Sequence, residues 1–249
     1  MPTSSSYNYT TNRDNIINRS LRIVGAIGQG ETGDTNAVTE AAMALNDLAK
    51  EWEADGMPLW ALTTYTLTPV ASTSTYSVPG TAVDIVVAPL KIFQVWSHNS
   101  SSNSDSPILL LTRQEYNILG AKTTGGAPSQ LWYNPPGNMG ISNSATGTVT
   151  LYPVPDATYV ATGTIKFTGH KPFEDFDAST DVPDFPQYFY NALIWGLADQ
   201  LSYEYGVSYA GRSMITKKAD FHKQLALSFG TEEGSFRIQP LPSWDWESY

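Results

Sequence analysis

A run of acidic residues at positions 174–184 is the densest group of candidate metal ligands in the chain. It holds five carboxylates, on Glu174, Asp175, Asp177, Asp181 and Asp184. A calcium loop of the EF-hand type starting at Asp175 would need glycine at its sixth position and glutamate at its twelfth, where the sequence has Thr180 and Pro186. We therefore interpret the run as a solvated linker that ends at a helix N-terminus, where the helix dipole favours negative charge. Weak binding of a cation stays an open alternative.

The other candidates for chemistry lack the spacing that chemistry needs. The glycine-rich stretch 25–33 follows a predicted helix instead of a strand and has no Lys-Ser or Lys-Thr after it, unlike a phosphate-binding loop. His98, His170 and His222 are scattered, and none has a second histidine three or four residues away. The chain has no cysteine, which excludes disulfides, thiolate metal sites and a cysteine nucleophile. It also lacks a G-x-S-x-G elbow, although sequence order leaves a Ser-His-Asp triad open. We predict no enzyme, no bound metal and no cofactor.

Charge is scarce and unevenly distributed. The 249 residues include 24 acidic and 14 basic side chains, which give a net charge of −10. Affinity for phosphates comes from Lys and Arg, so tight binding of nucleic acid by the monomer is not expected. Positions 60–173 carry four acidic and five basic residues. The acidity therefore belongs to the segments on either side of this block.

The single cluster of basic residues lies near the end of the chain and consists of Arg212, Lys217, Lys218 and Lys223. A solvated helix face is the default interpretation of such a group. The alternative is a place at a subunit interface, opposite an acidic surface of a neighbouring copy, or at the lumen of an assembly.

Two pairs of predicted helices flank the central block, because apolar residues recur there at helical spacing. The first pair covers 13–27, capped by Thr11 or Asn12, and 37–55, capped by Asn36. The third helix starts at a capping box formed by Asp184 and Gln187 and ends at Gly206. The fourth covers 208–229, and its predicted inward residues are Ile215, Ala219, His222, Leu225 and Ala226.

The block 60–173 has the character of strands, with alternating stretches at 62–69, 83–96, 147–152 and 162–168. Within it, 113–121 is the one stretch that reads as a helix. The fold class is therefore α+β: a four-helix bundle-like domain with an inserted antiparallel β domain, a sandwich or small barrel, and an extended C-terminal tail. The expected divisions are 1–59, 60–173, 174–230 and 231–249.

Aromatic residues are abundant, with 7 Trp, 14 Tyr and 9 Phe. Rings on a β domain could stack on sugars, as in carbohydrate-binding modules. Core packing and subunit contacts are the favoured explanation, because aromatic residues are enriched in both. The start of the chain has neither the basic head nor the apolar stretch of a signal peptide, and no run of ~18 apolar residues predicts a membrane span.

The order of motifs along the chain resembles the head-to-tail adaptor (connector) proteins of short-tailed bacteriophages. The motifs are IINRSLRIVG at 16–25, ALNDLAKEWEADG at 44–56 followed by LW at 59–60, YTLT at 65–68, YSVP at 76–79, LYPVP at 151–155, DVPDFP at 181–186, ALIWGLADQL at 192–201 and YG at 205–206. The resemblance covers roughly 13–230, and it rests on the ordered set because no single motif is diagnostic.

The resemblance implies a structural virion protein, made in the host cytoplasm and placed at the capsid–tail junction. Such proteins form homo-oligomeric rings, usually of twelve copies, that dock under the portal protein after DNA packaging. The ring extends the DNA channel, receives the tail nozzle protein, helps to retain the packaged double-stranded DNA without binding it specifically, and contacts no membrane. The alternative is a carbohydrate- or receptor-binding phage structural protein that uses the aromatic-rich β domain.

Two further expectations follow for the adaptor interpretation. An acidic channel lining would repel the duplex and let it slide, whereas Lys and Arg would grip it. The tail would dock on the portal through residues 235–249, with Phe236, Trp244, Trp246 and Tyr249 as aromatic anchors and Arg237 as the partner of a carboxylate.

Overall fold

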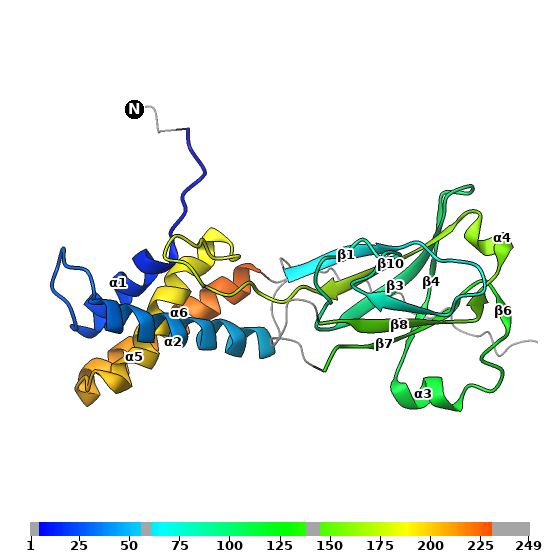
Figure 1. The fold of residues 1–249 in the computed structure, drawn as a ribbon. Helices are drawn as coiled ribbons and strands as arrows, with labels where there is room; N and C mark the ends of the chain where they lie inside the picture. Colours follow the sequence, from blue (N-terminus) through cyan, green and yellow to red (C-terminus); the bar gives the residue numbers. More distant parts are fainter. Residues whose placement is uncertain (1–4, 56–60, 138–144, 231–249) are drawn as a thin grey trace, which may run out of the picture.

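The structure, a computed structural model that describes residues 5–55, 61–137 and 145–230, consists of a helical unit and a β unit at opposite ends of an elongated molecule (Figure 1). The helical unit contains α1 (Arg13–Val24), α2 (Thr35–Ala54), α5 (Tyr190–Glu204) and α6 (Tyr209–Phe229). The β unit is formed by residues 61–170, which lie between α2 and α5 in sequence. The α+β class predicted from the sequence is confirmed, whereas the limits of the four predicted divisions stay predictions.

The first helix begins at Arg13, as its cap predicts, but ends at Val24, three residues before the predicted end. The Asn12 side chain accepts a hydrogen bond from the backbone N–H of Asn15, and Gly25 adopts a left-handed conformation with φ of 78°. Glycine reaches this conformation without strain, which ends α1 at Val24. The prediction of Asn36 as the cap of α2 is wrong. Asp34 accepts from the N–H of Ala37, so α2 begins two residues earlier than expected.

The prediction of a capping box at Asp184 is also wrong. The Asp184 carboxylate lies 2.8 Å from Nζ of Lys171, and it caps no helix. Pro186 keeps an extended backbone, with φ of −59° and ψ of 152°. A short 3-10 turn, η2 (Gln187–Phe189), follows it and leads into α5 at Tyr190. The Asp184 side chain, which the sequence pattern assigned as a helix cap, is therefore engaged in an ion pair with Lys171 instead.

α5 is the centre of the helical unit, since α1, α2 and α6 all pack against it. Gly196 lets α2 approach closely, because a Cβ at this position would lie 3.1 Å from Leu48 and 3.2 Å from Trp52. The buried hydroxyl of Ser20 donates to the backbone oxygen of Ile194 at 2.8 Å and ties α1 to α5. The fully buried side chains around these contacts include Ile16, Ile17, Leu21, Leu45, Phe189, Leu193 and Leu197.

The β unit is a sandwich of two four-stranded sheets around its own apolar core. One sheet has the order β1 (Leu62–Leu67), β10 (Gly163–His170), β3 (Ile92–Asn99), β4 (Ser104–Pro107). The other has the order β2 (Thr75–Val78), β8 (Gly147–Tyr152), β7 (Gln130–Asn134), β5 (Leu109–Leu111). Its core contains Leu67, Val78, Leu131, Val149, Ile165 and Phe167.

The β unit departs from the sequence prediction in two respects. Two strand pairs are parallel, β5 with β7 and β6 (Gly125–Gly126) with β9 (Val154–Pro155), although the other pairs are antiparallel as expected. The second difference is a short helix, α4 (Ala157–Val160), that was not predicted. The predicted helix at 113–121 is present as α3 (Arg113–Ile118), with a capping box between Thr112 and Glu115.

The chain enters and leaves the β unit at one place. Leu62 at the start of β1 pairs with His170 at the end of β10. The N–H of Lys171 then donates to the backbone oxygen of Ala61 at 2.9 Å. Within the described residues, no helix combines the length and apolar character needed to cross a membrane.

We expect Leu45→Ala to lower the free energy of unfolding by about 2–5 kcal/mol, because it removes a fully buried side chain and leaves a cavity in the core of the helical unit. Urea denaturation followed by far-UV circular dichroism measures the change. Met43→Ala, on the same helix but 58% exposed, is the matched control and should change it by less than about 0.5 kcal/mol. Equal losses in both variants would contradict the assigned core.

Candidate functional site

The acidic segment 174–184 binds to its own helices. Lys50 Nζ lies 2.9 Å from Asp175, and Lys171 Nζ lies 3.1 Å from Glu174 and 2.8 Å from Asp184. Two lysines thus form ion pairs with three of the five carboxylates. The segment borders a hollow of about 300 Å³, yet the described residues contain no group of three or more His, Asp or Glu side chains arranged to hold a metal ion.

Backbone contacts make the same segment a strap across α1 and α2. The N–H of Arg13 donates to the oxygen of Asp181 at 2.8 Å, and the Arg13 guanidinium donates to the oxygen of Asp177 at 2.8 Å. On the α2 side, the Asn46 side chain accepts from the N–H of Phe176 at 2.8 Å. Lys50 also donates to the oxygen of Phe173 at 2.8 Å. These contacts assign the segment a structural role within one copy.

Titratable groups near the strap are perturbed by their surroundings. Burial raises the pKa of Glu53, against the hydrogen bond that its carboxylate accepts from the N–H of Phe173. The hydrogen bond to Asp184 raises the pKa of Lys171. Both shifts have local structural causes, so neither needs a catalytic explanation.

The three histidines lie on different elements and do not come together. His98 on β3 contacts Asp105 at 2.7 Å. His170 at the end of β10 is buried, and this burial lowers its pKa, as does the nearby Lys91. His222 on α6 stacks on Trp195, and burial followed by the charge of Lys218 lowers its pKa. The three histidines therefore do not form a cluster.

The predicted basic cluster divides into two pairs with different surroundings. Arg212 lies over the ring of Tyr203, 4.3 Å from its centroid. Lys223 pairs with Asp55 at 2.9 Å and lies over the ring of Trp52. Both therefore have partners within one copy. Lys217 and Lys218 are exposed, and neither forms an ion pair with any described residue.

Exposed apolar side chains accompany the two exposed lysines. Met214, Phe221 and Leu225 are 70%, 57% and 56% exposed. Their spacing of seven and four residues places them on one side of α6. We call the set Met214, Lys217, Lys218, Phe221 and Leu225 the α6 outer face. The prediction that Leu225 points inward is wrong, because the buried side of α6 is made by Ile215, Ala219 and Ala226.

The sequence analysis did not predict the α6 outer face, although the spacing of apolar residues along the helix indicates it. Apolar residues of α6 follow two helical stripes, one through 215, 219 and 226 and another through 214, 221 and 225. A helix on the surface of a globular protein normally needs one such stripe. A second stripe therefore indicates a second contact.

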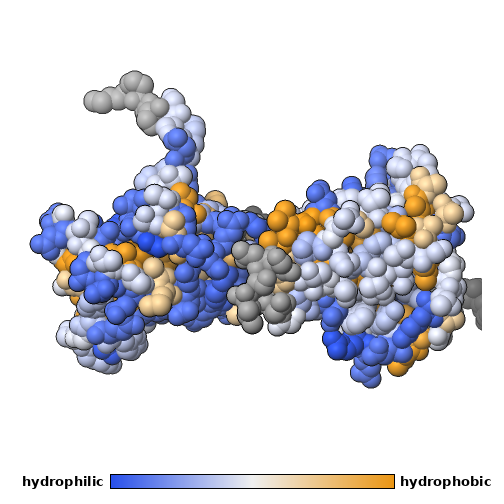
Figure 2. Space-filling model, in the orientation of Figure 1, coloured by the Kyte–Doolittle hydropathy of each residue, from blue (hydrophilic) through white to orange (hydrophobic). Residues whose placement is uncertain are grey.

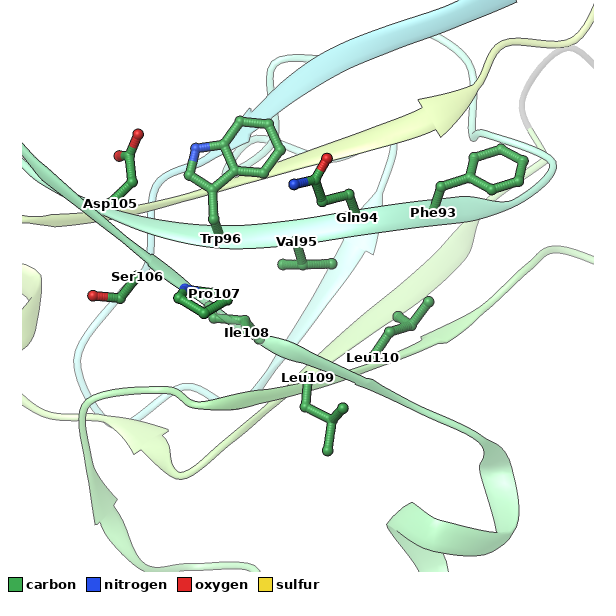
Figure 3. A pocket seen from close by; sticks show the side chains of 10 residues that line it. All are labelled: Phe93, Gln94, Val95, Trp96, Asp105, Ser106, Pro107, Ile108, Leu109 and Leu110. Carbon is green, nitrogen blue, oxygen red and sulfur yellow. The ribbon is translucent and has the colours of Figure 1, made fainter. Parts of the chain in front are cut away.

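The β unit carries a groove of about 460 Å³ where the chain crosses from β4 to β5. Figure 3 shows Trp96 and Gln94 on one side of β3, with Val95 on the other side, near Ile108. Phe93 and Leu109 are 58% and 61% exposed, and the lining is mostly hydrocarbon. A sugar presents many hydroxyl groups that need hydrogen-bond partners when they are buried, so this lining suits an apolar segment better than a carbohydrate.

Two other aromatic rings of the β unit, those of Tyr116 and Trp132, stack on each other and so cover one face of each ring. Trp132 stacks on Tyr116 with centroids 4.9 Å apart. Arg113 lies over the Trp132 ring and Lys122 over the Tyr116 ring. The pair is thus a poorer platform for a sugar than two open rings would be. The predicted tail anchors Phe236, Arg237, Trp244, Trp246 and Tyr249 lie outside the described residues.

The surface of the two units differs in polarity, as their charge predicts. In Figure 2 the helical unit is predominantly hydrophilic, whereas the β unit is paler, with scattered hydrophobic patches. The charged residues of the chain are concentrated outside 60–173. Charged residues are therefore denser on the helical unit than on the β unit.

Comparison with known proteins agrees with the family expected from the motif order. The model of a family described as SU10 adaptor protein matches residues 11–236, which include both units. A search of curated proteins gave no match. Because the matched residues make up most of the sequence, the chain belongs to the SU10 adaptor family, the head-to-tail adaptors of short-tailed phages.

Proposed function

We propose that copies of this protein form a ring beneath the portal, which extends the DNA channel and receives the tail nozzle. Family membership gives the protein a structural role at the head-to-tail junction of the virion. The finer proposal is carried by one observation: α6 presents an exposed apolar and basic face whose lysines have no ion-pair partner among the described residues of one copy. The family match over both units agrees with it. Twelve copies is the stoichiometry expected for such a ring.

The dimensions of the helical unit fit a channel wall. α2 has 20 residues and α6 has 21, so each is about 30 Å long at ~1.5 Å per residue. Several such helices side by side in neighbouring copies would make a wall of this height. The sandwich, attached at one end of the helical unit (Figure 1), would project from that wall as a separate body.

The charge of the chain supports passage of DNA without capture. A net charge of −10, concentrated outside the β unit, would give an assembled ring a strongly negative potential. A duplex near acidic side chains is repelled, and no counterions are released to favour binding. We propose that Asp and Glu outnumber Lys and Arg on the lumen.

The carbohydrate- or receptor-binding alternative has weaker support. Its best site is the groove beside β3, whose lining is mostly apolar. Binding of the purified protein to a glycan array, together with failure to bind a portal, would favour this alternative over the adaptor role.

We expect deletion of residues 235–249 to abolish docking on the portal encoded by the same phage, because buried aromatic side chains are typical hot spots of interfaces. Negative-stain microscopy of portal rings mixed with the full or truncated chain measures docking. Far-UV circular dichroism of the truncated chain should show the helical unit folded, and Trp244→Ala with Trp246→Ala should reproduce the loss. Docking by the truncated chain at full-length affinity would refute the role of the tail.

We also expect the purified protein not to change the mobility of duplex DNA in a gel-shift assay at ~0.15 M ionic strength. The negative net charge of the protein opposes association with DNA. The same assay repeated at lower salt gives the internal comparison. Binding that strengthens steeply as salt is lowered would indicate a basic DNA-contacting surface and would contradict the proposed acidic lumen.

A further inference from the structure

We infer that neighbouring copies in the ring contact each other through two different faces of the helical unit, the α6 outer face of one copy and an acidic face of α2 on the next. This inference rests on the proposed function, because it assigns the contact that would hold the proposed ring together. It adds the residues on both sides of that contact.

The first face is apolar in its middle and positively charged. Met214 and Phe221 lie seven residues apart on α6, with Lys217 and Lys218 between them, and Leu225 continues the stripe one turn further. All five side chains are exposed. Exposed apolar groups grouped in this way mark contacts with another protein.

The second face has the same layout with the opposite charge. Glu40, Met43, Asp47 and Glu51 are exposed and recur every three or four residues along α2, so they lie on one side of the helix. We call these four residues the α2 outer face. Met43 is 58% exposed between Glu40 and Asp47. None of the three carboxylates forms an ion pair with a described residue.

The two faces complement each other in chemistry. Met43 can be buried against Met214 and Phe221, while the carboxylates of α2 face the ammonium groups of Lys217 and Lys218. An apolar centre with complementary charges around it is the usual composition of a specific protein interface. The helices are of nearly equal length, 20 and 21 residues, so the contact can extend over several turns.

Among the residues that the structure describes, none forms an ion pair with the charged groups of either face. The inward sides of α2 and α6 both pack against α5, and both outer faces consist of side chains that point away from these contacts. The ion pair that does join α6 to α2 uses Lys223 and Asp55, which belong to neither face. A second copy is therefore the partner that the charges favour.

The kind of symmetry follows from the difference between the faces. If two copies paired α6 with α6, Lys217 and Lys218 would face the same lysines of the other copy. If they paired α2 with α2, carboxylates would face carboxylates. Contacts between two different faces instead join copies head to tail, which yields a ring when the rotation closes. The charges thus disfavour a symmetric dimer.

Two double variants test this pairing with the full chain. Lys217→Glu with Lys218→Glu makes both faces acidic, and Glu40→Lys with Asp47→Lys makes both basic. Assembly is measured by negative-stain microscopy on purified portal rings of the same phage and by sedimentation of the chain alone at high concentration. Lys91→Glu with Lys122→Glu, on the β unit, carries the same charge change as the acidic variant and is the matched control. Far-UV circular dichroism establishes that each variant is folded.

Each double variant alone should assemble at least about 10-fold less well than the unmodified chain, because like charges then meet at every contact. An equimolar mixture of the two should assemble again by alternation, and so should one chain carrying all four substitutions. The control should assemble normally. If the separate variants form rings as well as the unmodified chain, or if neither the mixture nor the fourfold variant recovers, this pairing is wrong while the adaptor role stands. If the unmodified chain forms no ring with or without the portal, the proposed function and this inference fail together.

Discussion

The close packing of three helices around α5 is the contact on which the rest of the molecule depends. Gly196 brings α2 within van der Waals distance through Leu48 and Trp52, and Ser20 fixes α1 through a buried hydrogen bond to Ile194. α6 covers another side of α5. Because α5 follows the β unit in sequence and α1 and α2 precede it, this core can form only when the two ends of the chain meet. The strap 174–184 secures the meeting by binding α1 and α2.

The sequence was informative where structure is determined by neighbouring residues. Helical spacing located α1, α2, α5 and α6, and the cap at Asn12 was predicted correctly because it acts within one turn. One cap prediction, at Asn36, missed the nearby Asp34. Another failed because a distant residue competes for the predicted capping side chain. Asp184 has a good capping sequence, but Lys171, on the other side of the strap, holds its carboxylate. The sheet order and the parallel pairing of β5 with β7 depend on contacts between residues far apart in sequence, which periodicity does not report.

The same division applies to the candidate contact surfaces. The basic residues of α6 could be recognised as a cluster, but the sequence did not separate Arg212 and Lys223, which have aromatic and acidic neighbours, from Lys217 and Lys218. The sequence placed Ile215, Ala219 and Ala226 on the inner side of α6, but only the packing of α6 on α5 shows that Leu225 belongs to the outer stripe. The acidic face of α2 was not predicted for a related reason. Acidic residues are frequent in the sequence, 24 in all, so the three of this face do not stand out as a group. They are recognised as one exposed face only once the buried residues of α2 are known.

The place where the β unit joins the helices has a consequence for how such proteins diversify. Ala61 and Lys171 are one hydrogen bond apart, so more than a hundred residues are attached through two adjacent strand ends. A short loop could span that separation, and a different sandwich could be spliced onto the same two ends without rethreading the helices. Genomes that exchange modules by recombination would find in this junction a site where one body of the protein can be replaced while the other keeps its fold.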